Sequence, residues 1–165
     1  MTRFLSIALI ATALAAGCSK NPDTQAFGTA FPEPARGLSF VEGGRCNLDF
    51  VTGAPIERGW RADTAQPIRF SGWALEDAAN PASEWIVVEL AAPGDRARYF
   101  VVTTFRSPRP DLAAALGDGP GVRNAAFEVV ARADTIPRGR YIVRLLMRGA
   151  SGGLRCETNR RVELT

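Results

Sequence analysis

The residues of this chain that could perform chemistry are mainly carboxylates, because the 165-residue sequence contains no histidine. Its absence removes the commonest general base, the Ser-His and Cys-His nucleophile systems, and most zinc sites. Two carboxylates suffice for glycoside hydrolysis, and the candidates here are Glu76, Asp77, Glu84 and Asp111. Adjacent acidic residues such as Glu76 and Asp77 are more typical of a turn. The sequence therefore predicts a protein that is not an enzyme and that has no cofactor or metal.

Arginine side chains offer a second kind of chemistry, the binding of anions. Arg140, Arg144 and Arg148 are spaced four residues apart, which places them on one face of a predicted strand. This face could bind an anionic glycan or a lipid headgroup. Alternatively it lies in solvent, with Glu157 neutralising Arg144. The formal net charge of the chain is only +3, which does not indicate nucleic-acid binding.

Three tryptophans are candidates for stacking on the rings of a glycan. Trp73 and Trp85 fall within predicted strands, so we expect them in the core. Trp60 lies between Gly59 and Arg61 in a predicted loop, and it is the candidate with an accessible ring. Carbohydrate binding is thus one of the functions that the sequence leaves open.

The N-terminus has the features of an export signal. Arg3 is followed by a short apolar run over residues 4–16, well under the roughly 20 residues that a membrane-spanning helix needs. The run ends in Leu14, two alanines, Gly17 and Cys18. We therefore expect residues 1–17 to be a signal peptide that is removed after export.

This ending resembles the lipobox of bacterial lipoproteins, in which a branched apolar residue and two small residues precede a cysteine. The resemblance implies that Cys18 is modified with diacylglycerol, becomes the mature N-terminus and is then acylated on its amino group. Several acyl chains would hold the protein stably at a membrane. Ser19 in place of aspartate implies the outer membrane of a Gram-negative bacterium. The alternative is an ordinary secretory signal with an incidental cysteine.

Export to an oxidising compartment bears on the two remaining cysteines. Cys46 lies in the first predicted strand of the domain and Cys156 in the last, both on apolar faces. In the periplasm such a pair is expected to form a disulfide. Two free buried thiols are the alternative.

The chain after the predicted lipid anchor divides into a tether and one domain. Residues 18–43 are rich in proline and glycine and show no sustained period, which predicts a tether between membrane and domain. Residues 44–165 suffice for one domain but not for two. Four apolar residues of the tether, more than a free chain requires, indicate that part of it lies against the domain: Phe27, Phe31, Leu38 and Phe40.

Seven segments of the domain read as strands, because they alternate apolar and polar residues or are apolar throughout. One helical turn is expected at residues 111–116, with Asp111 as its N-cap and Gly117 after its end. This pattern predicts an all-β fold, a sandwich of two antiparallel sheets with about seven strands. The predicted strands are residues 46–50, 68–75, 85–90, 97–105, 126–131, 141–148 and the segment from 154 onward.

The register of the last two strands can be predicted, because a slip of one residue turns every side chain to the wrong face. One register satisfies both the burial of apolar side chains and the pairing of charges. Its pairs are Met147 with Leu154, Leu145 with Cys156, and Arg144 with Glu157.

Residues 136–141, Ile-Pro-Arg-Gly-Arg-Tyr, resemble the corner of immunoglobulin-like and fibronectin-like sandwiches, where a tyrosine bonds to backbone upstream. Residues 71–75, 109–115 and 137–141, in that order, also resemble an uncharacterised β-sandwich module of bacterial envelope proteins. These resemblances imply an immunoglobulin-like fold, and they assign no functional residue.

These features together predict a non-enzymatic lipoprotein of the cell envelope that presents a β-sandwich for binding or for structural support. A carbohydrate-binding module that recognises an envelope glycan is the alternative. The expected partners are the membrane, reached through the lipid anchor, and an envelope glycan or another envelope protein.

Overall fold

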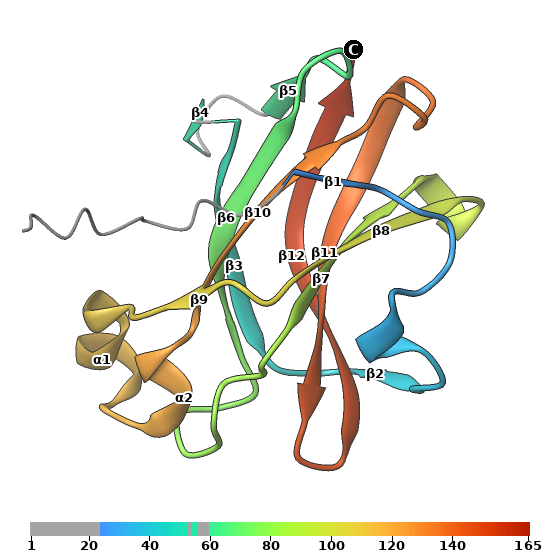
Figure 1. The fold of residues 1–165 in the computed structure, drawn as a ribbon. Helices are drawn as coiled ribbons and strands as arrows, with labels where there is room; N and C mark the ends of the chain where they lie inside the picture. The colour runs from blue at the N-terminus through green and yellow to red at the C-terminus, as the bar shows by residue number, and fades with distance from the viewer. Residues whose placement is uncertain (1–23, 53, 56–59) are drawn as a thin grey trace, which may run out of the picture.

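The computed structural model describes residues 24–52, 54–55 and 60–165. The predicted signal peptide at residues 1–17, the predicted lipid site Cys18 and the start of the predicted tether lie outside the described residues. Within the described residues, twelve strands form two six-stranded sheets that pack against each other (Figure 1). The architecture is therefore mostly β, as the sequence predicts.

Sheet A consists of β1 (Gln25–Ala26), β3 (Arg45–Val51), β4 (Ala54–Pro55), β6 (Ile68–Leu75), β9 (Arg106–Ser107) and β10 (Ala126–Arg132). Its strand order is β1-β10-β6-β3-β4, and β9 also pairs with β10. Sheet B consists of β2 (Phe40–Glu42), β5 (Trp60–Ala62), β7 (Ile86–Ala91), β8 (Arg98–Thr103), β11 (Gly139–Gly149) and β12 (Gly152–Leu164). Its order is β2-β12-β11-β7-β8, and β5 also pairs with β12. The helical elements are α1 (Pro110–Leu116), α2 (Pro120–Arg123), η1 (Glu33–Ala35) and η3 (Pro93–Asp95).

All seven strands predicted from the sequence are present. They are the long strands β3, β6, β7, β8, β10, β11 and β12. The predicted register of the β11–β12 hairpin is confirmed at its three pairs, Met147 with Leu154, Leu145 with Cys156, and Arg144 with Glu157. Alternation and burial were sufficient here because each of these strands has one face on the core.

The prediction of purely antiparallel sheets is wrong at the edges. β1 runs parallel to β10, and both β2 and β5 run parallel to β12. These strands have only two or three residues, too few for any alternation to be visible in the sequence. They reach the sheets from distant parts of the chain, so their direction is set by tertiary contacts.

The helical region also differs from the prediction in two respects. The N-cap of α1 is Arg109, and Asp111 lies inside the first turn, because Pro110 occupies the first helical position. The single helical turn expected from the sequence is followed by a second helix, α2, which likewise begins with a proline, Pro120. Gly117 ends α1 as predicted, with a φ of 87° and its N–H bonded to the Ala113 carbonyl.

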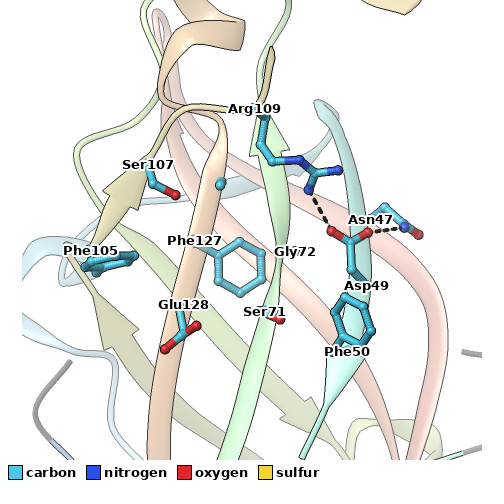
Figure 2. A pocket seen from close by; sticks show the side chains of 11 residues that line it. Asn47, Asp49, Phe50, Ser71, Gly72, Phe105, Ser107, Arg109, Phe127 and Glu128 are labelled. Carbon is cyan, nitrogen blue, oxygen red and sulfur yellow. Dashed lines mark hydrogen bonds and ion pairs between the residues drawn. The ribbon is translucent and has the colours of Figure 1, made fainter. Parts of the chain in front are cut away.

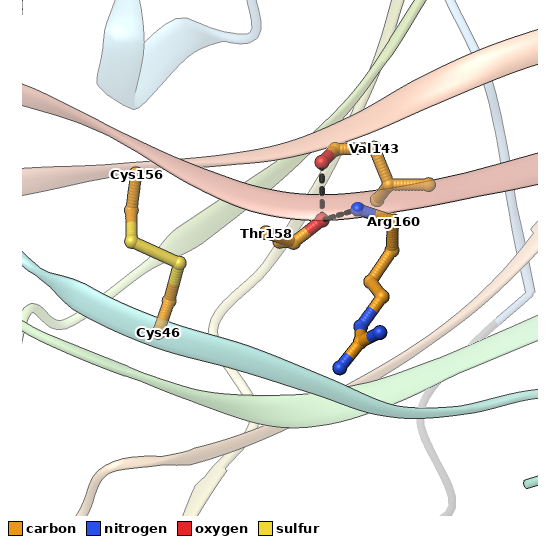
Figure 3. The surroundings of a disulfide bond; sticks show 5 residues. All are labelled: Cys46, Val143, Cys156, Thr158 and Arg160. Carbon is orange, nitrogen blue, oxygen red and sulfur yellow. Dashed lines mark hydrogen bonds between the residues drawn. A yellow bond between two sulfur atoms is a disulfide. The ribbon is translucent and has the colours of Figure 1, made fainter. Parts of the chain in front are cut away.

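The facing surfaces of the two sheets enclose the main core. The disulfide between Cys46 and Cys156 joins β3 to β12 across this core, with the two Cα atoms 6.2 Å apart (Figure 3). The predicted bridge is therefore present. Both sheets contribute fully buried side chains to this core. They include Leu48, Ile68, Phe70 and Phe127 of sheet A and Ile86, Leu90, Leu145 and Met147 of sheet B.

A bulge interrupts the β11–β12 ladder between Val143 and Arg144. The hydroxyl of Thr158 donates to the carbonyl of Val143 and accepts from the N–H of Arg160 (Figure 3). The backbone groups that the bulge removes from the ladder therefore keep partners.

Residues 24–42, which the sequence analysis assigned to a tether, lie against both sheets. β1 pairs with β10, and Gly28 bonds to Phe100 at the edge of sheet B. Phe31 then stacks on Phe40 and on Phe100, with ring centroids 5.6 and 4.5 Å apart. This packing covers the outer face of sheet B, so the folded unit begins well before the predicted boundary at residue 44.

The corner predicted at residues 136–141 is formed. Tyr141 follows Gly139 by two residues, and its hydroxyl donates to the carbonyl oxygen of Pro137 at 2.6 Å. Burial, together with nearby Tyr99, raises the pKa of the Tyr141 phenol. The hydrogen bond fixes the chain at the entry to β11.

We expect Tyr141→Phe to lower the free energy of unfolding by about 0.5–1.5 kcal/mol, since it removes one donor and leaves the Pro137 carbonyl without it. Urea denaturation of the full chain measures this. Tyr99→Phe is the matched control, because Tyr99 packs edge-on to Tyr141 at 5.9 Å. Equal losses in the two variants would mean that the corner hydrogen bond contributes nothing.

Candidate functional site

Trp60 is not available for stacking on a sugar. The residue lies in β5, with only 4% of its surface exposed, and belongs to the main core. The prediction that Trp60 lies in a loop is therefore wrong, and the reason is that a parallel edge strand of three residues has no local signature. Trp85 is buried as expected, and Trp73 is partly buried against the cluster under α1 and α2.

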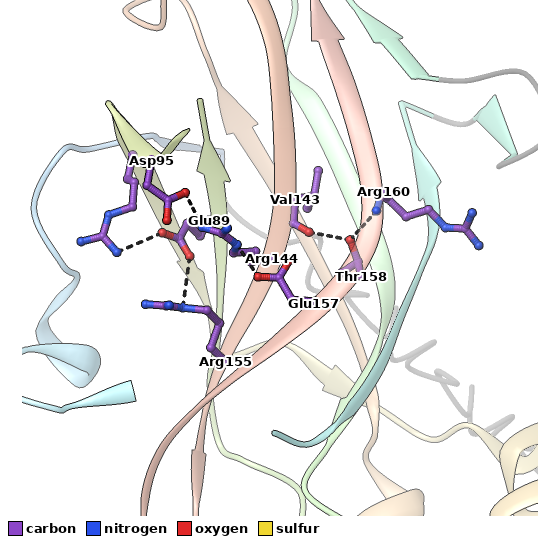
Figure 4. A network of polar contacts seen from close by, with 9 residues as sticks. Glu89, Asp95, Val143, Arg144, Arg155, Glu157, Thr158 and Arg160 are labelled. Carbon is purple, nitrogen blue, oxygen red and sulfur yellow. Dashed lines mark hydrogen bonds and ion pairs between the residues drawn. The ribbon is translucent and has the colours of Figure 1, made fainter. Parts of the chain in front are cut away.

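The three arginines of β11 do not form one anion site. Arg144 donates to Asp95 at 2.7 Å and to Glu157 at 2.5 Å, so its charge is already matched (Figure 4). Arg140 and Arg148 are exposed, but they are eight residues apart, about 26 Å along a strand. The alternative in which Glu157 neutralises Arg144 thus agrees with the contacts.

Arg144 belongs to a charged network on the outer face of sheet B. At its centre is Glu89 of β7, which has no exposed surface. Arg98 lies 3.4 Å and Arg155 3.9 Å from the Glu89 carboxylate (Figure 4). Burial raises the pKa of Glu89, against the lowering effect of Arg155, Arg144 and Arg98. Arg98 also lies over the ring of Phe31, so the N-terminal segment helps to enclose the network.

The four candidate catalytic carboxylates have structural partners or lie apart. Glu76 accepts from the N–H of Ala150, and Asp77 accepts from the N–H groups of residues 79 and 80 in a tight turn. Glu76 and Glu84 line the same cavity of about 370 Å³. Asp111 lies elsewhere, in a bidentate pair with Arg109.

The outer face of sheet A carries an open groove of about 570 Å³ that the sequence analysis did not foresee (Figure 2). Its floor is made of small residues, including Ser71, Gly72 and Ala126, from β6 and β10. Phe50 of β3 and Phe105, just before β9, lie on opposite sides of it (Figure 2). Their exposed fractions are 45% and 38%, which is unusual for phenylalanine.

A β-bulge turns Phe50 outward. Leu48 pairs with Gly72 and Phe50 with Ser71, so Asp49 is an extra residue without a partner on β6. The extra residue shifts the alternation, so that Asp49 and Phe50 both face outward while Val51 turns into the core. Regular alternation over the predicted strand at residues 46–50 would place Phe50 on the same inner face as Cys46 and Leu48, and the bulge is the physical reason that Phe50 faces outward instead.

Gly72 makes the bulge possible. A Cβ atom at this position would lie 2.2 Å from the carbonyl oxygen of Asn47, closer than any real contact. The absence of a side chain therefore lets β3 approach β6 at the bulge.

We expect Gly72→Ala to lower the free energy of unfolding by about 1–3 kcal/mol, because β3 must shift to accommodate the methyl group. Gly28→Ala is the matched control, since a Cβ there would meet nothing within 4 Å. Urea denaturation of both variants measures the difference. Similar midpoints for the two would show that β3 and β6 are not in close contact at Gly72.

The wall of the groove that carries Phe105, across from Phe50, is held in place by hydrogen bonds. Buried Thr103 donates to the carbonyl of Glu128 at 2.7 Å and accepts from the N–H of Phe105 at 3.0 Å. Arg106 donates to the carbonyl of Ala74 at 2.9 Å, which ties β9 to β6. Burial lowers the pKa of Arg106 to about 10. Both phenylalanines of the groove therefore stand on fixed backbone.

Arg109 closes one end of the groove (Figure 2). It donates to Asp49 at 2.6 Å and holds Asp111 at 2.8 and 2.7 Å. Asp49 also accepts from the side chain of Asn47 at 2.7 Å. These bonds raise the pKa of Arg109 and lower that of Asp111. The polar end of the groove is thus pre-organised, with opposite charges paired.

A second open cavity of about 580 Å³ begins at the other side of Arg109. It is lined by apolar residues of the α1–α2 region, such as Pro108, Ala113 and Val122, with Asp118 and Arg123 also on its wall. Arg109 lines both cavities, so the two lie next to each other.

No model of a known protein family matches this chain, and no curated protein is significantly similar to it. None of the described helices is long and apolar enough to cross a membrane. The described residues contain no cluster of three or more side chains that could hold a metal ion. The fold and the groove together define the class of this protein. It is a two-sheet β protein with a disulfide and an open groove that exposes aromatic side chains.

Proposed function

We propose that this chain is a lipoprotein of the bacterial envelope whose β-sandwich is a non-enzymatic binding module, and that the groove on sheet A is its binding surface. The observation that carries the proposal is the pair of exposed phenylalanines, Phe50 and Phe105, held on fixed backbone across a floor of small residues. A bulge that re-aims a side chain is a recurrent feature of functional surfaces. Exposed aromatic groups beside a few placed polar groups are what a ligand surface requires.

The finer description of the fold is an immunoglobulin-like sandwich. Its support is the hydrogen bond from Tyr141 to Pro137 and the inter-sheet disulfide. The disulfide differs from the one in antibody domains, because Val143 and not a cysteine follows the corner tyrosine by two residues.

The location follows from the N-terminus. The run ending in Cys18 supports lipid attachment at an outer membrane, and the disulfide fits an oxidising periplasm. In such a protein the groove would be displayed close to the membrane surface.

Sedimentation with isolated envelopes of a Gram-negative bacterium tests the binding surface. The full chain with Cys18→Ser is used, so that no lipid anchor causes sedimentation. We expect Phe50→Ala with Phe105→Ala to reduce the sedimented fraction about tenfold at limiting envelope, since two stacking contacts are lost. Val41→Ala is the control, because Val41 is 63% exposed on β2 of the other sheet. Equal sedimentation of the groove variant and the control would refute the proposal.

A carbohydrate-binding module is the favoured form of this function. The groove offers two accessible rings, whereas a purely structural module has no need to expose them. Trp60 is buried and cannot stack on a sugar, whereas Phe50 and Phe105 are exposed and can.

A further inference from the structure

The charges at the groove are unfavourable for an anion. Asp49 and Glu128 line it with carboxylates, and Arg109 is the guanidinium among its described lining residues. Arg109 is already bound to Asp49 and Asp111. Arg69, at the rim, lies 3.7 Å from Glu128. A phosphate, sulfate or carboxylate ligand would have to displace one of these pairs and would then meet the freed carboxylate.

The same surface is suited to a sugar ring. A pyranose has a face of C–H bonds that packs on an aromatic ring, and hydroxyl groups at its edge that need hydrogen-bond partners. Phe50 and Phe105 supply the rings. The hydroxyls of Ser71 and Ser107 also line the groove, and within the described part of the chain neither has a hydrogen bond to another residue. They are available to a ligand.

The length of the surface indicates more than one ring. The two cavities of about 570 and 580 Å³ share Arg109 in their linings, and each is within the size range of a small-molecule site. Both cavities are open to solvent. A linear ligand could therefore extend beyond the surface at either side, and its ends need not be bound. Pro108 and Pro110, on either side of Arg109, line the second cavity with rigid apolar surface.

We propose that the ligand of this surface is an uncharged linear oligosaccharide that packs on Phe50 and Phe105 and continues past Arg109 into the second cavity. This inference rests on the proposed function, since it names the ligand class of the same groove. Arg109 and Asp49 then act as a neutral hydrogen-bonding pair toward sugar hydroxyls.

Isothermal titration calorimetry of the full chain carrying Cys18→Ser tests the ligand class. The probes are cellohexaose, laminarihexaose and maltohexaose as neutral hexamers, a galacturonate hexamer as the anion, and a glucosamine hexamer as the cation. We expect a neutral hexamer to bind at least about tenfold more tightly than either charged hexamer and than its own dimer. Tighter binding of a charged hexamer, or no binding of any neutral hexamer, would overturn the inference.

One variant in each cavity, with Val41→Ala as a control, separates the contributions of the two cavities. Phe50→Ala is expected to weaken the neutral hexamer about three- to tenfold, and Val41→Ala to leave it unchanged. Ala113→Glu, in the second cavity, is expected to weaken the hexamer and to leave the dimer unaffected. If no neutral hexamer binds but the phenylalanine variants still lose sedimentation with envelopes, the binding surface stands and the ligand class is wrong.

Discussion

Replacing Cys46 and Cys156 together by alanine is expected to lower the free energy of unfolding by about 2–5 kcal/mol. The bridge closes a loop of 110 residues and ties the first long strand of sheet A to the last strand of sheet B. A loop of this length restricts the unfolded chain strongly in the chain-entropy account of disulfides. Urea denaturation of oxidised parent and variant, both as the full chain, measures the loss.

The reducing agent dithiothreitol provides the control for this prediction. It should shift the denaturation midpoint of the parent toward that of the double variant, and it should not shift the variant. A parent midpoint that does not respond to reduction would show either that the thiols are free or that the bridge carries no stability.

Glu89→Lys is expected to cost about 3–5 kcal/mol, enough to leave much of the chain unfolded. Glu89 has no exposed surface, and Arg98, Arg144 and Arg155 all face it. Reversing its charge places a buried cation among three guanidinium groups. Glu89→Gln is the matched control, because it keeps the size of the side chain and resembles the protonated form. A soluble Lys variant that unfolds at the same urea concentration as the Gln variant would contradict this account.

A comparison of the parent with Glu89→Gln reports the direction of the pKa shift of Glu89. Because burial raises the pKa above its usual 4.5, the folded chain holds this proton more tightly than the unfolded chain. Its contribution to stability is complete below about pH 4.5 and is lost as the pH rises through the folded value. The free energy of unfolding of the parent, relative to Glu89→Gln, should therefore decrease as the pH rises from 4.5. A relative stability that increases with pH would contradict the raised pKa.

The sequence was informative where a strand alternates without interruption between a core face and an outer face. Alternation located β6 and the β11–β12 hairpin, and charge and burial together selected the correct pairing of Arg144 with Glu157. The disulfide could be predicted because the two cysteines lie in the first and the last predicted strand of the domain. These features depend on periodic burial, which the order of apolar and polar residues in a segment records directly.

The N-terminal segment and the short edge strands could be predicted only in part. Phe31 and Phe40 indicated contact with the domain, but nothing in residues 24–42 shows that they cross from sheet A to the outer face of sheet B. Trp60 was misplaced for the same reason. Strands of two or three residues are defined by their partners and not by their own sequence.

The groove escaped prediction because its parts are far apart in the chain. Asp49 and Arg109 are 60 residues apart, and only the fold brings them to 2.6 Å. The outward position of Phe50 could not be predicted, because the bulge at Asp49 has no signature in an alternating segment. The glycine at position 72, within an otherwise continuous strand, was the one local signal of a close approach between strands.

The proposed location at a membrane depends on the proposed anchor, and intact-mass spectrometry of the exported protein tests this anchor most directly. We predict a chain that begins at Cys18 and carries a diacylglyceryl group and an amide-linked acyl chain, and a Cys18→Ser variant that leaves the detergent phase. An unmodified N-terminus, or unchanged partitioning of the Cys18→Ser variant, would contradict the assignment of this protein to a membrane surface.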